Sequence, residues 1–101
     1  MATSLHLLMS ADPRAVADCV AFARAGDAIV LVDRGVDLLA YWTGHPAEPL
    51  NALDNVSLAA LEADVLATGL ARRAAELEMA LWSDAQWVEQ VCSAGRALSW
   101  K

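Results

Sequence analysis

Apolar residues recur along this chain in two patterns, short continuous runs and stripes with helical spacing. Residues 28–32 (Ala-Ile-Val-Leu-Val) form a continuous, largely β-branched run, which is typical of a central parallel strand. The apolar runs at 4–9 and 56–61 predict two further strands. We expect a fourth strand from about Leu77 and a terminal edge strand at 98–100.

The first helix is the most clearly marked element of the chain. Asp12 is a good N-cap, and Pro13 suits the first helical position, where its missing N–H costs nothing. Gly26 is the predicted stop. In between, apolar residues follow the i, i+3, i+4, i+7 spacing of a core-facing stripe: Val16, Cys19, Val20 and Ala23.

Capping residues mark the two helices that we expect in the second half. Asp64 predicts a helix that runs through Leu70 or beyond. Ser83 or Asp84 predicts a last helix, which stops at Gly95.

The expected elements alternate as β-α-β-(α)-β-α-β-α-β. Residues 36–42 fit either a short helix or an irregular edge, and residues 43–55 fit a loop because they hold Pro46 and Pro49. Such alternation predicts an α/β fold, with helices on both faces of a small, mostly parallel sheet of four to five strands. The length of 101 residues predicts a single domain over 1–101. Ligand chemistry in such folds gathers at the carboxyl ends of the strands.

Composition adds a surplus of apolar residues to this picture. Hydrophobic residues make up 57% of the chain, above the usual share of about 45–50%. Either the sheet is buried on both faces or another chain covers part of the surface. Four tryptophans favour the second explanation, because tryptophan is enriched at the centres of interfaces.

The net charge of −6 argues against direct binding of nucleic acid, since Arg72-Arg73 is the only adjacent basic pair. Residues 1–10 lack the basic start of a signal peptide, and Asp12-Pro13 interrupts the apolar run that follows. The apolar runs are also far shorter than the roughly 20 residues that span a bilayer. We therefore expect a cytoplasmic protein with reduced thiols and no membrane contact.

Motifs for cofactors and metals are missing from the expected positions. The turn after the first strand, residues 9–12, has no glycine and so argues against a nucleotide site. The two histidines, His6 and His45, and the two cysteines have no zinc-ligand spacing. We expect no cofactor and no metal. His6, inside a strand pattern, is interpreted as a satisfied core or edge histidine.

The residues alone give both cysteines a packing role. Cys19 lies on the core-facing stripe of the first helix, and free cysteine is among the most buried residue types. Cys92 follows Ala85, Val88 and Val91 on the last helix and is interpreted in the same way.

Four segments, spread from end to end, together resemble the TusB/DsrH family of sulfur-relay proteins. They are Leu-His-Leu-Leu at 5–8 with a following helix that carries Cys19, the stretch Gly-Asp-Ala-Ile-Val-Leu-Val-Asp-Arg-Gly-Val at 26–36, residues 61–70, and residues 87–101 with their terminal Ser-Trp-Lys. Residues 61–70 resemble a family segment that has a basic residue before its glycine. Thr68 stands at that position here.

The resemblance implies a three-layer α/β/α fold and a heterohexamer with homologous C/F-type and D/E-type subunits. Such complexes pass persulfide sulfur toward 2-thiouridine at the tRNA wobble position, or serve dissimilatory sulfur oxidation. The chain would then be a subunit of a sulfur carrier rather than a stand-alone enzyme.

The principal sulfur-carrying cysteine of these complexes belongs to the D/E-type subunit. DsrH-type proteins have a cysteine at the position of Cys19, which makes Cys19 a candidate persulfide carrier here. We weigh three hypotheses: an assembly subunit in tRNA thiolation, a DsrH-like subunit with an active Cys19, and an interaction domain without sulfur chemistry. We also expect the isolated chain to form homo-oligomers through tryptophan-bearing surfaces.

Overall fold

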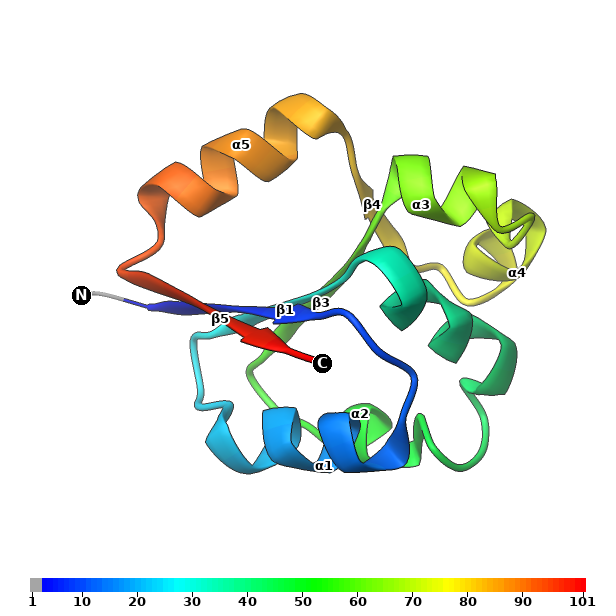
Figure 1. Cartoon of the computed structure of the whole chain (residues 1–101), viewed down its shortest axis with the longest axis horizontal. Helices are drawn as coiled ribbons and strands as arrows, with labels where there is room; N and C mark the ends of the chain where they lie inside the picture. The colour runs from blue at the N-terminus through cyan, green and yellow to red at the C-terminus, as the bar shows by residue number, and fades with distance from the viewer. Residues whose placement is uncertain (1–2) are drawn as a thin grey trace.

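A computed structural model describes residues 3–101 and shows a five-stranded sheet in which all neighbouring strands are parallel. The strand order is β4-β3-β2-β1-β5, with helices on both sides of the sheet (Figure 1). The predicted α/β fold is therefore confirmed. The strands are β1 (Ser4–Leu8), β2 (Ala28–Leu31), β3 (Ser57–Leu61), β4 (Ala80–Trp82) and β5 (Arg96–Trp100).

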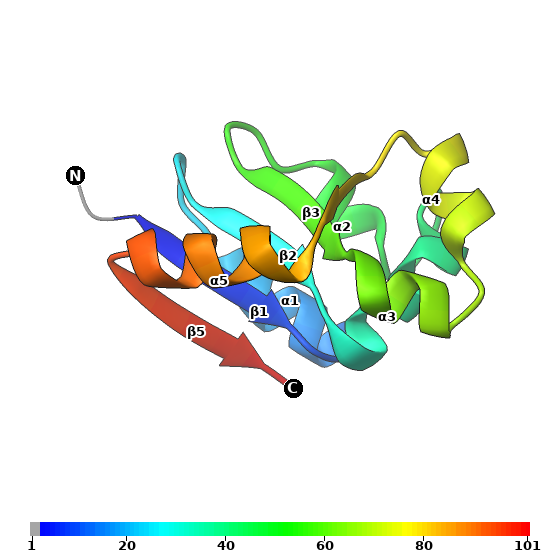
Figure 2. The same ribbon diagram turned by 90° about the horizontal axis from the view of Figure 1, so that it is seen from above.

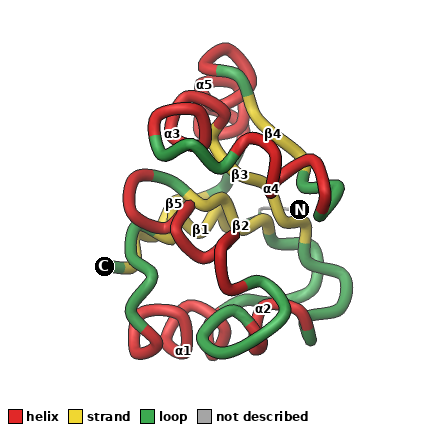
Figure 3. The backbone as a smooth tube through the Cα atoms, turned by 90° about the vertical axis from the view of Figure 1, so that its right-hand side faces the viewer, coloured by secondary structure: helices red, strands yellow, loops and turns green. Residues whose placement is uncertain are grey.

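The connections between the strands are mostly short helices. They are α1 (Pro13–Phe22), the 3₁₀ helix η1 (Asp33–Tyr41), α2 (Glu48–Asn51), α3 (Glu62–Ala67), α4 (Ala71–Glu76) and α5 (Asp84–Ser93). Helices α1 and α2 cover one face of the sheet, while α3 and α5 lie on the other side (Figures 1 and 3). Seen from above, α5 runs diagonally across the strands (Figure 2).

Local chemistry explains the two long helices. The Asp12 side chain accepts a hydrogen bond from the backbone N–H of Arg14, and Pro13 opens α1 as predicted. At α5, Ser83 and Gln86 form a reciprocal capping box, in which each side chain binds the other residue's backbone N–H. Of the two caps considered for α5, the structure uses Ser83.

Several predicted boundaries are wrong. The helix expected to run through Leu70 or beyond ends at Ala67, and the last strand begins at Arg96 rather than at Leu98. Helix α1 ends at Phe22, with Ala23 as its C-cap, so that Gly26 lies in the turn before β2 instead. Helix α3 begins before Asp64, whose side chain accepts a hydrogen bond from the backbone N–H of Asp33 rather than capping its own helix. The expected strand from Leu77 begins only at Ala80, because Leu77 is the C-cap of α4 and Glu78 adopts a positive φ in the turn that follows.

The face of the sheet toward α1 and α2, here called the α1 face, holds the larger part of the core. Side chains alternate between the two faces along each strand. His6, Leu8, Ile29 and Leu31 point to the α1 face, where α1 contributes its own buried stripe. This cluster continues into η1, α3 and α4 through Leu38, Leu39, Val65 and Ala74.

The opposite face of the sheet, here called the α5 face, is covered less completely. Its fully or nearly buried members are small in number: Leu5, Val30, Val32 and Ala59. Trp82 and Trp87 pack against them and are themselves half-buried. No residue of α5 is buried, so this helix covers the sheet loosely.

The carboxyl end of β1 is closed by backbone packing. A Cβ atom placed on Gly35 of η1 would lie 1.9 Å from the carbonyl oxygen of Leu8. That oxygen also accepts a hydrogen bond from the backbone N–H of Val32. Only glycine fits this close approach, and η1 therefore occupies the edge at which the fold class predicts ligand chemistry.

Candidate functional site

Cys19, the sequence-predicted site residue, lies completely inside the core on the α1 face. Burial raises the pKa of its thiol to about 12, because a thiolate loses its hydration in an apolar environment. At neutral pH the thiol is therefore protonated, whereas sulfur transfer requires a thiolate that can reach its partner. A role for Cys19 as persulfide carrier stays a prediction, and it requires an opening of the packing around α1.

Cys92 occupies the opposite environment. It is an exposed residue on α5, so its interpretation as a core cysteine is wrong. The reason lies in the rotation of the helix: α5 turns Trp87 and Ala94 toward the sheet. The apolar stripe from which a buried Cys92 was inferred faces outward instead: Ala85, Val88, Val91 and Cys92 are all exposed.

A buried polar cluster joins the first, second and last strands on the α1 face. The Nε2 atom of His6 lies 2.9 Å from Oδ2 of Asp27. The indole N–H of Trp100 donates to Nδ1 of His6 over 3.1 Å. Since Nδ1 accepts, the ring proton belongs on Nε2, where it is donated to Asp27. His6 is fully buried with both ring nitrogens paired, which confirms its interpretation as a satisfied core histidine.

Asp27 anchors this cluster as a carboxylate. Burial acts to raise the pKa of Asp27, but hydrogen bonds from His6 and from the backbone N–H groups of Arg24 and Ser4 lower it below its ordinary value. Its side chain thus ties the start of β1 to the turn before β2. The sequence signal was an acid directly before an apolar strand, and only the parallel register places it beside His6.

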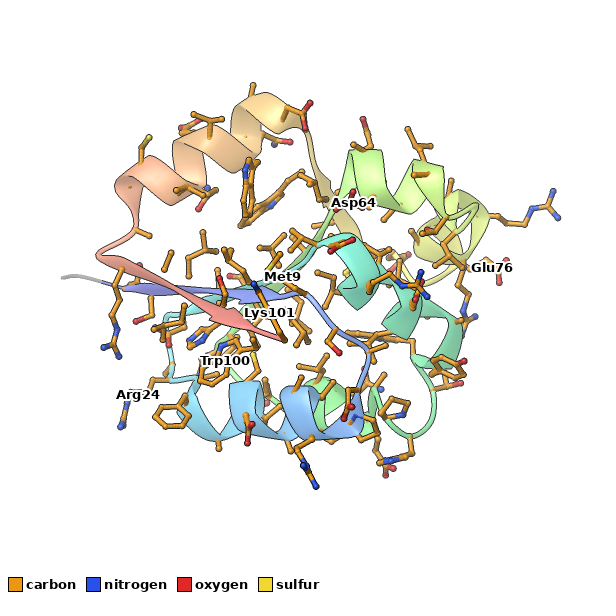
Figure 4. The ribbon with its side chains drawn as sticks, viewed as in Figure 1. Met9, Arg24, Asp64, Glu76, Trp100 and Lys101 are labelled. Atoms are coloured by element: carbon orange, nitrogen blue, oxygen red, sulfur yellow. The ribbon has the colours of Figure 1, made fainter. Side chains whose placement is uncertain are left out.

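The aromatic side of the cluster faces α1. The rings of Phe22 and Trp100 are tilted, with centroids 5.3 Å apart, and His6 stacks on Trp100 at 6.1 Å. Trp100 lies between the last strand and α1 (Figure 4). With every polar atom paired inside the fold, the His6–Asp27–Trp100 cluster is suited to hold strands together rather than to carry out acid–base chemistry.

A hollow of about 400 Å³ opens at the amino-terminal ends of β1, β2 and β5. Residues from these three strand starts and from the end of α1 line it, among them Ser4, Phe22, Arg24, Asp27 and Arg96. The hollow lies at the opposite edge of the sheet from the one at which the fold class predicts ligands.

The other candidate ligands remain apart from one another. Within residues 3–101, no three His, Cys, Asp or Glu side chains gather in a way that could hold a metal ion. His45 is exposed in the loop before α2. The same part of the chain has no helix of the length and apolarity that crossing a membrane requires.

Comparison with known proteins decides the family. The profile of the family described as DsrH like protein matches residues 10–96. The chain belongs to the DsrH-like family. Residues 10–96 include α1 with Cys19, the β2 strand and the whole of α5. As a DsrH-like protein, the chain is a sulfur-relay-type subunit, and the family implies a complex with sulfur-relay partners.

A solved structure shows the same fold at low sequence identity. It is a conserved protein of unknown function from Bacteroides thetaiotaomicron, with a TM-score of 0.60 and 14% identity over 95% of this chain and 93% of that one. No curated protein matches the chain. The structural likeness supports the α/β architecture of this DsrH-like protein and says nothing about its chemistry.

Proposed function

We propose that this DsrH-like chain is an assembly subunit of a cytoplasmic sulfur-relay complex, in which persulfide sulfur passes toward 2-thiouridine at the tRNA wobble position. The burial of Cys19 carries this proposal, because a fully buried thiol with a pKa raised to about 12 is a poor sulfur acceptor. In this role the chain supports the sulfur-carrying cysteine of a homologous subunit.

The loosely covered α5 face supports an assembly role. Val88 and Val91 are 57% and 38% exposed, and Cys92 and Ala85 continue the same side of α5. At about 100° per residue, these four side chains share one flank of the helix. We define them as the α5 flank. Exposed apolar stripes of this kind are typical of surfaces that another subunit covers.

The tRNA assignment is testable with the wobble modification itself. Deletion of the gene in its host should remove most 2-thiouridine from tRNA, measured by mass spectrometry of nucleosides. Reintroduction of the Cys19→Ser variant should restore it to near the wild-type level. A normal 2-thiouridine content in the deletion strain would refute the tRNA role, and a loss of sulfur oxidation instead would favour the dissimilatory pathway.

Cys19 as a persulfide carrier is the second candidate function, and the family match across α1 supports it. The step would be attack of the Cys19 thiolate on a donor persulfide, with transfer of the outer sulfur and release of the donor thiolate. Incubation with a cysteine desulfurase and cysteine should then add the mass of one sulfur atom to the peptide that contains Cys19. Cys19→Ser would abolish the adduct. The absence of any adduct in the wild-type protein would refute the carrier role.

Partner binding separates an assembly subunit from an interaction domain without sulfur chemistry. Co-expression with homologous C/F-type and D/E-type subunits should yield one stable complex, and a charge placed in the α5 flank by Val88→Asp should disrupt it. Gln90→Asp, at an exposed position of the same helix outside the α5 flank, is the matched control. Failure of the wild-type chain to join such subunits would contradict the assembly role.

Self-association of the isolated chain tests the same surface without a partner. We expect homo-oligomers in light scattering at high protein concentration, weakened by Val88→Asp and unaffected by Gln90→Asp. A strictly monomeric wild-type profile would contradict this expectation.

A further inference from the structure

The hollow at the amino-terminal ends of the strands contains two arginines, although the chain as a whole carries a net charge of −6. Arg24 follows α1, and Arg96 opens β5, so the two basic residues reach the hollow from different elements. The side chain of Arg24 extends outward beside the end of α1 (Figure 4). The fold therefore concentrates positive charge at one edge of an acidic protein.

Among residues 3–101, no carboxylate forms an ion pair with either of these two guanidinium groups. Elsewhere in the described chain, Arg34 pairs with Asp37 and Arg73 pairs with Glu76. Within residues 3–101, neither Arg24 nor Arg96 forms a salt bridge, and the Nε atom of Arg96 donates only to the hydroxyl oxygen of Ser4. Among the described residues, the remaining guanidinium N–H groups have no side-chain or backbone acceptor, so that they can bind an anion in the planar bidentate geometry that guanidinium favours.

Asp27, the acidic residue in the lining, opposes an anion only weakly. Its Oδ1 accepts from the backbone N–H of Ser4, and its Oδ2 accepts from His6 and from the backbone N–H of Arg24. Only 7% of Asp27 is exposed. Its charge is thus compensated by donors inside the fold, while the arginines face the solvent.

Phe22 gives the hollow an apolar wall. This side chain is 59% exposed, and its ring is fixed by contact with Trp100. An exposed aromatic ring beside two cationic side chains offers a stacking surface next to a binding group for oxygen anions. A volume of about 400 Å³ is sufficient for a ligand with both parts.

We propose that this hollow binds a small phosphate- or sulfate-type oxyanion that carries a flat apolar group, with Arg24 and Arg96 on the oxyanion and Phe22 on the apolar group. The site is separate from the sulfur-relay role and stands whether or not that role is correct. Cys19 lies within the core and does not line the hollow.

The test is a titration of the ¹⁵N-labelled protein at constant ionic strength, first with inorganic phosphate and then with phenyl phosphate. We expect saturable shifts of the Gly26 and Gly95 amide signals, which border the hollow. The double variant Arg24→Gln/Arg96→Gln should weaken binding about tenfold or more, because each charge-assisted contact is lost. Arg14→Gln/Arg72→Gln removes the same charge from exposed positions outside the hollow and should change binding less than about twofold.

Phe22→Ala tests the apolar part separately. Phenyl phosphate should bind more tightly than phosphate to the wild-type protein, and this difference should disappear in the Phe22→Ala variant, with thermal unfolding as the check that the fold persists. Non-saturable shifts, or equal weakening by both arginine pairs, would overturn the oxyanion site. Equal binding of phosphate and phenyl phosphate to the wild-type protein would overturn the apolar subsite.

Discussion

Adjacent leucines on β1 lie in very different surroundings. Leu8 points to the α1 face and is fully buried, whereas Leu7 points to the α5 face and is only half-buried. The same contrast holds for the two clusters as a whole: among residues 3–101, the larger has fourteen buried residues and the smaller has four. Neighbouring side chains of one strand therefore contribute differently to the stability of the fold, because one face of the sheet is covered more fully than the other.

The open α5 face also explains the apolar surplus of the chain. The α1 face is closed by α1 and α2 and pinned by the His6–Asp27–Trp100 cluster. On the α5 face, α5 covers the sheet without a buried residue of its own. A chain with 57% hydrophobic residues thus keeps part of its apolar surface exposed on α5, at Val88 and Val91, while Phe22, Tyr41 and Leu66 are exposed elsewhere. We place the partner subunit on the α5 side.

Thiol reactivity should give the largest difference between the two faces. Cys92 on α5 is exposed, while Cys19 is completely buried. Ellman's reagent should modify one thiol per native chain quickly and the second at least about a thousandfold more slowly, because Cys19 must wait for an opening of the fold. In denaturant both should react at once. Rapid reaction of both thiols in the native protein would contradict the difference in burial between Cys19 and Cys92, and it would favour the carrier role of Cys19.

Truncation of the two leucines should show the contrast in stability. Leu8→Ala removes a fully buried side chain and should lower the free energy of unfolding by roughly 2–5 kcal/mol. Leu7→Ala, the matched control on the same strand, should cost about half as much or less, because its site is partly open to solvent. Urea unfolding measures both losses. Equal losses would mean that the two faces are equally closed.

Asp27→Asn tests how much the His6–Asp27–Trp100 cluster stabilises the α1 face. Loss of the charge-assisted hydrogen bonds should cost roughly 1.5–3 kcal/mol at neutral pH. Because the pKa of Asp27 is lowered in the fold, its ionised form favours folding above the ordinary value of 3.8, and this contribution is lost as the pH falls through the lower folded value. Urea unfolding between pH 2 and pH 7 should therefore show a smaller acid-induced loss in the variant. An unchanged pH profile would contradict the role of Asp27.

Trp100→Phe should have the smallest effect. The variant keeps an aromatic ring but removes the N–H that donates to Nδ1 of His6, and a buried acceptor without a partner should cost about 1 kcal/mol. Trp87→Phe on the α5 face is the control, since Trp87 packs against the smaller cluster without a side-chain hydrogen bond among the described residues. Thermal unfolding measures the loss of stability in both variants. A larger loss for Trp87→Phe would place the stronger aromatic anchor on the α5 face.

The sequence predicted those features that depend on local patterns. The continuous run at 28–32 and the Asp12-Pro13 start of the first helix lie where expected, because strand periodicity and capping are local properties. The end of α1 could not be predicted from Gly26, since a chain turn can use a glycine several residues beyond the last helical one. The prediction that Asp64 caps its helix was wrong for a related reason, because its side chain binds the backbone of Asp33, far away in the sequence.

The candidate sites depended on long-range placement. Helical spacing alone predicted that Ala85, Val88 and Cys92 face the core. In the structure, Trp87 and Ala94 are the residues at this helix that pack against the sheet. The hollow and the polar cluster could not be predicted from the sequence for the same reason, because strands from opposite ends of the chain form both. Periodicity identifies an apolar side of a helix, and only the assembled fold decides what covers it.

The contact of Gly35 with the Leu8 carbonyl has a consequence for any attempt to redesign this protein. At that edge of the sheet, backbone meets backbone, and a Cβ at position 35 would lie 1.9 Å from an oxygen that already accepts a hydrogen bond from Val32. Replacement of side chains alone will not create a ligand cavity there. An engineer who wants one must rebuild the whole connection from Asp33 to Tyr41, or else begin from the opposite edge, where the fold has already left space.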